Sequence, residues 1–177
     1  MKPTSFSSII FIIFWLSIIG CGQSNHYIEE RLKEFIGTEI IIPGDLLLLN
    51  NTANPIRKDA KYKIISYVDS ASCTSCYLDR FSQAWTDMID NFKDMDFSLF
   101  IIFHSEDIEG IRTLFNSYKL NIPFFIDCYG DFKNSNNIPL EGLFHTFLLR
   151  DNTVTLVGTP FSNSKLLELY KQEMSKD

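Results

Sequence analysis

Apolar positions follow two different periods along this chain, and the periods alternate. Residues 97–103 form a nearly unbroken apolar run, which predicts a strand buried on both faces, and residues 61–69 also form a strand-like run. Over residues 77–92 and 106–118 the apolar side chains instead recur every three or four residues. That spacing predicts amphipathic helices. The order from residue 61 is therefore strand, helix, strand, helix.

The C-terminal part of the chain predicts a hairpin followed by a helix. A short strand is expected at 123–127, and residues 144–150 and 153–157 form two further apolar runs. Asp151 and Asn152 separate those two runs and suit a tight hairpin turn. The last apolar positions have helical spacing, and Asn163 precedes them as a helix-capping residue.

Two other segments give weaker patterns. Residues 27–36 have helical spacing with charged residues on the other side, and Leu46–Leu49 is a short extended run. The Asn-rich segment from Gly130 to Pro139 predicts a loop. Alternating β and α units predict a mainly parallel sheet with helices on both faces. Because the hairpin adds antiparallel strands, the expected fold class is an α/β sandwich around a central mixed sheet.

The N-terminus predicts export. Lys2 is followed by the apolar stretch Ile9–Ile19, which is short for a membrane-spanning helix and suits a signal peptide. The stretch ends in Ile-Ile-Gly before Cys21, which resembles a bacterial lipobox. The resemblance implies cleavage before Cys21 and a lipid on that cysteine. The alternatives are an uncleaved anchor and an ordinary signal peptide.

This interpretation divides the chain into three parts. Residues 1–20 are the signal peptide, 21–26 a lipidated tether, and 27–177 one globular domain of ordinary size. Gly22 follows the lipidated cysteine where an inner-membrane retention signal would have Asp. We therefore expect a cell-envelope lipoprotein at the outer membrane, facing the periplasm.

The net charge of the chain bears on whether it binds nucleic acid. The net charge is −6 and the pI is about 5.0, with no cluster of Lys and Arg. An acidic chain without a basic patch is a poor nucleic-acid binder, so nucleic acid is not an expected partner. The 16 phenylalanines supply ample core material for one domain.

Candidate chemistry centres on the motif Cys73-Thr74-Ser75-Cys76, which lies between a predicted strand and a predicted helix. Thiols at a helix N-terminus meet the positive end of the helix dipole, which stabilises the thiolate of the first cysteine. Such a pair is suited to thiol–disulfide exchange. A zinc ribbon would need a second CxxC pair, and the chain has one.

The strand–CxxC–helix order with a closing ββα unit resembles the thioredoxin fold. More closely, the chain is similar to the membrane-anchored, thioredoxin-like thiol–disulfide oxidoreductases and redoxin-type lipoproteins of bacteria. The resemblance covers residues 35–175 and is carried by Asp69–Cys76, Phe144–Arg150 and Thr153–Gly158. It implies a thioredoxin-like three-layer sandwich.

The chain departs from the thioredoxin pattern in three features: the residues around the cysteines, the buried acid and the cis-proline. Ser72 replaces the aromatic residue before the first cysteine, and Thr74-Ser75 replaces Gly-Pro between the cysteines. Tyr67 stands where those proteins keep a buried acid, and a tyrosine is no carboxylate base near neutral pH. His145 aligns with the cis-proline that faces the pair.

The resemblance implies a role for each site residue. Cys73 would attack a substrate disulfide, and Cys76, less exposed, would resolve the mixed disulfide. His145 would pair with the Cys73 thiolate or accept a proton. No cofactor is expected. The partners would be disulfides of exported proteins or a membrane thiol relay, with the membrane reached through the lipid on Cys21.

Two alternatives remain open. In the first, Cys73, Cys76 and His145 are a ligand set for Cu(I) or Zn(II), since two thiolates and an imidazole suit both ions. In the second, the cysteines form a structural disulfide on a non-catalytic lipoprotein that only binds a partner. A bridge closing so short a loop adds little stability, which favours a chemical role.

Overall fold

The computed structural model describes residues 20–49, 57–118 and 122–176. Helix α2 (Gly20–Phe35) belongs to a unit separate from the compact unit Ile36–Asp177. The residues assigned to a tether, 21–26, fall within this helix. The predicted signal peptide, apart from Gly20, and the side chain of Cys21 lie outside the described part. Within the described ranges, no helix is long and apolar enough to cross a bilayer.

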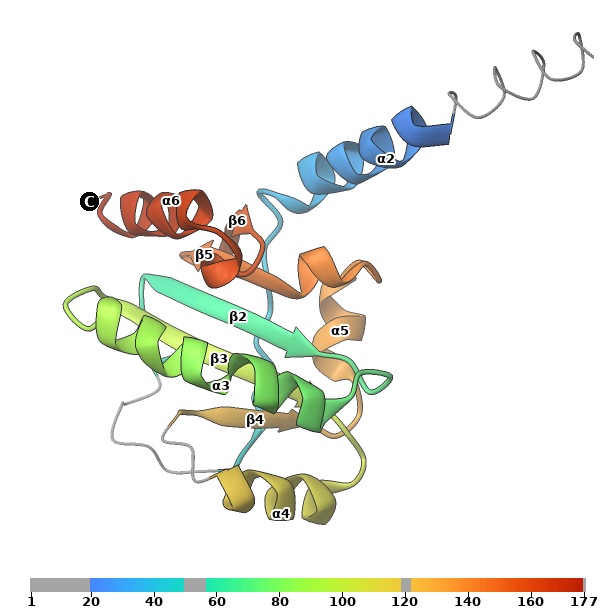
Figure 1. Ribbon diagram of the computed structural model, residues 1–177, viewed down its shortest axis with the longest axis vertical. Coiled ribbons are helices and arrows are strands. Elements are labelled where there is room, and N and C mark those ends of the chain that lie inside the picture. Colours follow the sequence, from blue (N-terminus) through green and yellow to red (C-terminus); the bar gives the residue numbers. More distant parts are fainter. Residues whose placement is uncertain (1–19, 50–56, 119–121, 177) are drawn as a thin grey trace, which may run out of the picture. The chain divides into compact units, whose positions relative to one another are not determined.

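The compact unit is built on a six-stranded mixed sheet (Figure 1). The strand order is β1-β4-β3-β2-β5-β6, in which β2, β3 and β4 run parallel and the remaining pairs are antiparallel. The strands are β1 (Leu47–Leu48), β2 (Tyr62–Val68), β3 (Phe97–His104), β4 (Phe124–Asp127), β5 (Thr146–Arg150) and β6 (Thr153–Val157). The central strand β2 lies between parallel β3 and antiparallel β5.

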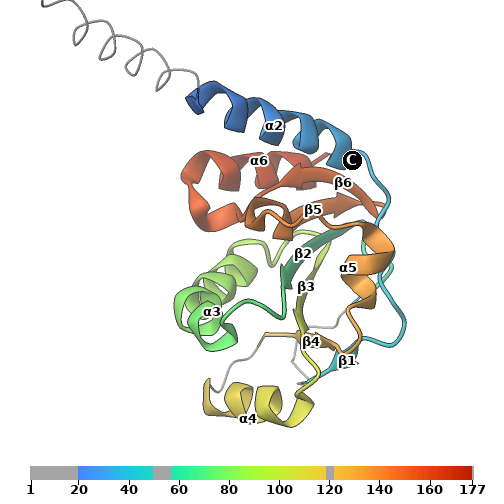
Figure 2. The same ribbon diagram turned by 90° about the vertical axis from the view of Figure 1, so that its right-hand side faces the viewer.

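Helices cover both faces of this sheet. Figure 2 shows α3 on one side of the strands and α5 on the other. The helices are α3 (Thr74–Asn91), α4 (Ile108–Tyr118), α5 (Asp131–Asn136) and α6 (Ser164–Met174), with the 3₁₀ turns η1 (Gly142–His145) and η2 (Pro160–Ser162). The predicted α/β sandwich with a central mixed sheet is confirmed, and its architecture is thioredoxin-like.

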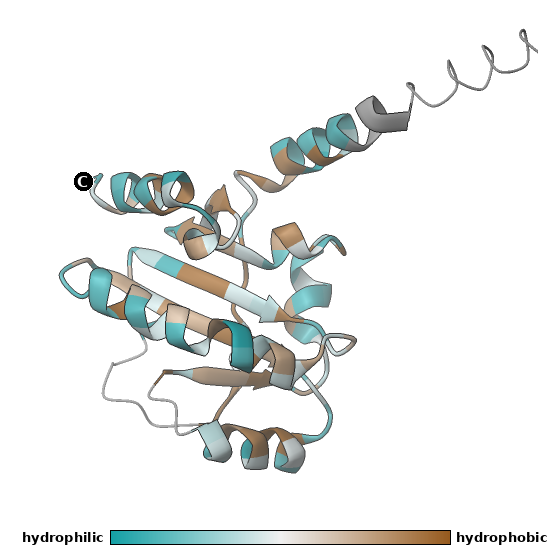
Figure 3. Cartoon of the chain, in the orientation of Figure 1, coloured by the Kyte–Doolittle hydropathy of each residue, from teal (hydrophilic) through white to brown (hydrophobic). Residues whose placement is uncertain are grey.

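The alternation of side chains along β2 separates two packed layers. All seven residues of β2 are buried, as in a strand covered on both faces. Tyr62, Ile64 and Val68 join the apolar cluster under α3, α4 and α6. Tyr67 points to the α5 side, where its ring meets Phe132. In Figure 3 the inner strands are coloured mainly as hydrophobic, whereas α3 carries both classes of residue.

Several local predictions are confirmed. Asp151 and Asn152 form the β5–β6 turn with φ of 50° and 67°, the left-handed values that Asn and Asp tolerate in tight turns. The Asn163 side chain accepts from the backbone N–H of Leu166 at 2.8 Å and caps α6. The helix predicted from residue 77 begins earlier, at Thr74, with Cys73 as its N-cap.

Two local predictions are wrong. The segment expected to be a loop before Pro139 contains helix α5. A hydrogen-bonded carboxylate nucleates it, because Asp127 accepts from the backbone N–H groups of Asp131 and Phe132, both at 3.0 Å. The strand expected from residue 144 begins two residues later, since residues 144 and 145 belong to η1.

Candidate functional site

The CxxC cysteines form a disulfide at the first turn of α3. Cys73 is the N-cap, and its Sγ accepts from the backbone N–H of Cys76 at 3.3 Å. The Ser75 hydroxyl lies 3.4 Å from the same sulfur. When the pair is reduced, these donors and the helix dipole would stabilise a Cys73 thiolate. Both cysteines are exposed.

The loop between β2 and α3 is organised by Asp69. Its carboxylate accepts from the backbone N–H of Ala71 at 3.0 Å, and its carbonyl accepts from that of Ser72 at 2.8 Å. Lys133 of α5 forms an ion pair with the same carboxylate. The hydrogen bonds from Lys133 and Ala71 lower the pKa of Asp69. The turn that ends at Cys73 is therefore built around an ionised carboxylate.

Tyr67 occupies the position of the buried acid of thioredoxins. Its side chain is 2% exposed, and its hydroxyl has no hydrogen-bond partner among the residues that the structure describes. Burial raises the pKa of Tyr67, and the nearby carboxylates of Asp69 and Asp127 raise it further. Tyr67 therefore keeps its proton at neutral pH, and it cannot take over the role of an acid that ionises there.

His145 lies beside Tyr67, directly before β5. Thr146 pairs with Ser66 of β2. His145 precedes Thr146 and Tyr67 follows Ser66, and the rings of these two neighbours lie edge to face with centroids 5.7 Å apart. The His145 Nε2 lies 3.1 Å from the Pro139 carbonyl. Because a carbonyl oxygen only accepts, Nε2 carries the proton in this bond and Nδ1 is the acceptor of the neutral ring. Burial lowers the pKa of His145, although the Pro139 bond and the Asp69 charge oppose that effect.

A chain of hydroxyl groups ties α3 to the sheet on the other side of β2. The Tyr77 hydroxyl accepts from the indole N–H of Trp85 at 2.7 Å and lies 2.8 Å from the Ser66 hydroxyl. Ser66 in turn lies 3.2 Å from the hydroxyl of Thr146. The residue after Cys76 is thus hydrogen-bonded to the centre of the fold, which fixes the first turn of α3 on the sheet.

The described part of the chain also bears on whether the protein holds a metal site. Among the described residues, no three His, Cys, Asp or Glu side chains are placed to hold a metal ion. Cys73, Cys76 and His145 are therefore not gathered as a ligand set. The free thiol of Cys128 is half-buried and packs against the apolar cluster under α3.

The comparison with solved structures supports the fold. No family model matches the chain, and no curated protein matches it. Among solved structures, a proposed protein disulfide isomerase from Bacteroides thetaiotaomicron aligns with a TM-score of 0.55 at 17% identity, over 80% of this chain and 91% of its own. A thioredoxin-like protein in its oxidised form aligns with a TM-score of 0.53 at 15% identity, over 80% and 96%.

A third solved structure also aligns with this chain. A protein from Chlorobium tepidum, described as a proposed thiol:disulfide interchange protein DsbE, gives a TM-score of 0.52 at 14% identity over 79% of this chain and 96% of its own. At these identities the likeness defines the fold. The chain has a thioredoxin-like fold with a CxxC disulfide at the first turn of α3.

Two functional features could not be found from the sequence. Lys133 lies in a segment whose composition predicts a loop, 64 residues from Asp69, and no local pattern links the two. The Tyr77 hydroxyl chain also joins residues far apart, because Ser66 and Thr146 are 80 positions apart. A polar residue inside a strand, as Ser66 is in β2, was the available signal for a buried hydrogen bond.

Proposed function

We propose that the protein is a thiol–disulfide oxidoreductase of the cell envelope that acts through Cys73 and Cys76. The observation that carries this proposal is the exposed disulfide at the first turn of α3 in a thioredoxin-like fold. Exposure lets a client sulfur reach the pair, and the helix N-terminus favours the thiolate that exchange requires. Its partners are disulfides of exported proteins or a membrane thiol relay.

In the reductive direction the dithiol form begins the cycle. The Cys73 thiolate attacks a client disulfide, forms a Cys73–client bond and releases one client thiolate, which takes up a proton. The Cys76 thiolate then attacks the Cys73 sulfur, which re-forms the Cys73–Cys76 disulfide and releases the second client thiolate. Two electrons pass from the dithiol to the client. In the oxidative direction the same steps run in reverse.

His145 is the proton acceptor for Cys76 in this proposal. Burial favours its neutral form, and the hydrogen bond to Pro139 leaves Nδ1 as the acceptor nitrogen. Tyr67 cannot take this role, since its own proton is held tightly. An imidazole that reaches the reduced pair would raise the thiolate fraction of Cys76 at neutral pH.

The direct test is the capture of clients. Cys76→Ser is expected to accumulate mixed disulfides through Cys73, because the resolving thiol is absent. Cys73→Ser is the matched control and is expected to capture nothing. Both variants carry Cys128→Ser, so that any adduct belongs to the CxxC motif, and adducts are identified by non-reducing electrophoresis and mass spectrometry. Failure of Cys76→Ser to capture an exported protein would contradict the proposal.

We also propose that lipid on Cys21 anchors the protein at the outer membrane, facing the periplasm. The support is the apolar stretch that ends in Ile-Ile-Gly before Cys21, with Gly22 after it. Cys21→Ser is expected to lose incorporation of a labelled fatty acid and to leave the membrane fraction. Label retained by Cys21→Ser would contradict this part of the proposal.

A further inference from the structure

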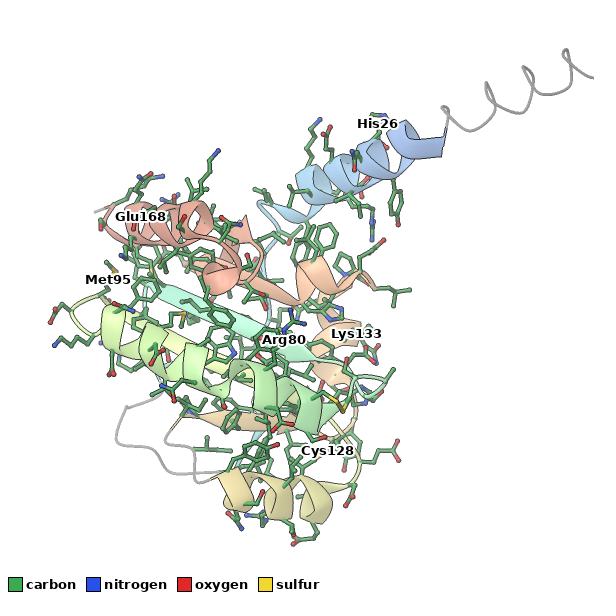
Figure 4. The ribbon with its side chains drawn as sticks, viewed as in Figure 1. His26, Arg80, Met95, Cys128, Lys133 and Glu168 are labelled. Carbon is green, nitrogen blue, oxygen red and sulfur yellow. A yellow bond between two sulfur atoms is a disulfide. The ribbon has the colours of Figure 1, made fainter. Side chains whose placement is uncertain are left out.

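Charged side chains from separate segments meet on the α5 side of the CxxC loop. Asp69 of the loop pairs with Lys133 of α5, and the two side chains are only 19% and 22% exposed. The charges of Asp69 and Lys133 also act on His145, which stands before β5. Figure 4 labels Lys133 on α5, which lies next to the loop after β2 in Figures 1 and 2.

We propose that Lys133 is a positioning residue for the exchange reaction, which holds the turn that presents Cys73 through its ion pair with Asp69. The inference rests on the proposed function. Asp69 makes four interactions within a few residues of Cys73: with Lys133, with the Ser70 hydroxyl, with the backbone N–H of Ala71 and, through its carbonyl, with that of Ser72. Lys133 is the only one of these partners that comes from another part of the fold.

Lys133 can hold this turn because α5 is itself fastened at both ends. Asp127, 3% exposed at the end of β4, binds the first turn of α5 through two backbone N–H groups. At the other end, the Asn136 side chain donates to the Ile41 carbonyl at 2.8 Å and accepts from its N–H at 2.7 Å. A six-residue helix fixed in this way gives the lysine a defined origin. The ion pair thus connects the active-site turn to β4 and to the segment around Ile41.

The same pair sets the charge next to His145. The groups that face this imidazole among the described residues are Asp69 of the loop, Lys133 of α5, Glu141 of its own segment and the ring of Tyr67. The carboxylates favour the imidazolium, whereas Lys133 opposes it. Without Lys133, the Asp69 charge would act on His145 uncompensated, and the imidazole would stay protonated to higher pH.

The test separates positioning from charge. Lys133→Met is expected to slow the reduction of a model disulfide by about tenfold, because small displacements of a reacting group are costly. It is also expected to move the acidic limb of the pH–rate profile upward by about one pH unit, the size of effect that one nearby charge produces. Adding Asp69→Asn to Lys133→Met should return the profile to its original pH while the rate stays low. Lys133→Arg should keep both properties near wild type.

Lys171→Met is the matched control, since Lys171 forms an exposed ion pair with Glu168 on α6. It should change neither the rate nor the profile. Thermal unfolding of each variant shows that the folded protein is being assayed. If Lys133→Met has the wild-type rate and profile, or differs only in stability, the inference is wrong.

The two proposals fail in distinguishable ways. Client capture by Cys76→Ser together with a wild-type profile for Lys133→Met would overturn the role of Lys133 and leave the oxidoreductase function standing. No exchange in the wild-type protein would overturn the function itself.

Discussion

The two sides of strand β2 beneath the CxxC motif differ in the polar groups that they contain. On the α3 side, an apolar cluster surrounds a chain of hydrogen-bonded polar groups. Each group in the chain has a partner: the Trp85 indole N–H and the hydroxyls of Tyr77, Ser66 and Thr146. On the α5 side, Tyr67 buries a hydroxyl without a partner in the described part of the chain, next to the Asp69–Lys133 pair and His145. The comparison indicates that the first side fixes the position of α3 and that the second sets the charge around His145.

The largest expected effect is on the stability of the α3 side. Trp85 is 1% exposed and donates to Tyr77, so Trp85→Ala should lower the free energy of unfolding by about 3–5 kcal/mol through lost packing and a lost partner. Urea unfolding followed by circular dichroism measures the change. The exchange rate of the remaining folded protein should stay within about twofold of wild type if this side only supports α3. A loss of rate without a loss of stability would reverse the assignment of the two sides.

His145 tests the other side through chemistry. His145→Gln should reduce the rate of disulfide reduction at neutral pH by about 10²-fold, the usual contribution of a general base. Since burial lowers the pKa of His145, the wild-type rate should begin to fall only when the pH drops below the ordinary histidine value of about 6.5. The variant should lack this acidic limb. An unchanged pH–rate profile in His145→Gln would remove His145 from the mechanism.

Tyr77→Phe tests how much the chain of hydroxyl groups contributes to stability. The change removes a hydroxyl that accepts from Trp85 and contacts Ser66, and leaves the ring in place. The free energy of unfolding should fall by about 2 kcal/mol, because the Trp85 N–H and the Ser66 hydroxyl each lose a partner. Chemical denaturation of the variant beside Tyr129→Phe, a change in a 78% exposed ring, provides the comparison. Equal stability of the two variants would show that the chain contributes nothing.

The smallest expected effect is that of Asp69→Asn on stability. The pKa of Asp69 is lowered in the fold, so its carboxylate stabilises the protein above about pH 4 and loses that effect as the pH falls through the lowered value. The variant should be about 1 kcal/mol less stable at pH 7, and the difference should vanish in acid. Denaturation curves at both pH values test this. A constant difference would mean that the ionised form is not what stabilises the turn.

Much of the fold followed from hydrophobic periodicity. The helices of the α3 side and the central strands have long, regular patterns, and the Asp151-Asn152 turn has a local chemical signature. Helix α5 was missed because six residues rich in Asn carry no apolar period, and its first turn depends on Asp127 at the end of β4. Short elements that depend on a distant partner are hard to infer locally.

The candidate site also contains features that the local sequence predicts and features that depend on distant contacts. The disulfide between Cys73 and Cys76 at a helix start was predictable, since spacing and context lie within a few residues. The contact of Lys133 with Asp69 arises from how the loop and α5 meet, which no local pattern records. The roles of His145 and Cys21 stay predictions.

The redox potential of the Cys73–Cys76 pair tests the central claim most directly. The protein is equilibrated in glutathione buffers with chelator present, alkylated, and analysed by mass spectrometry so that Cys128 is counted separately. An exchange catalyst should give a potential between about −270 and −120 mV, the range of proteins that exchange disulfides. A pair that stays oxidised below about −300 mV would be a structural disulfide, and the proposed oxidoreductase function would be wrong.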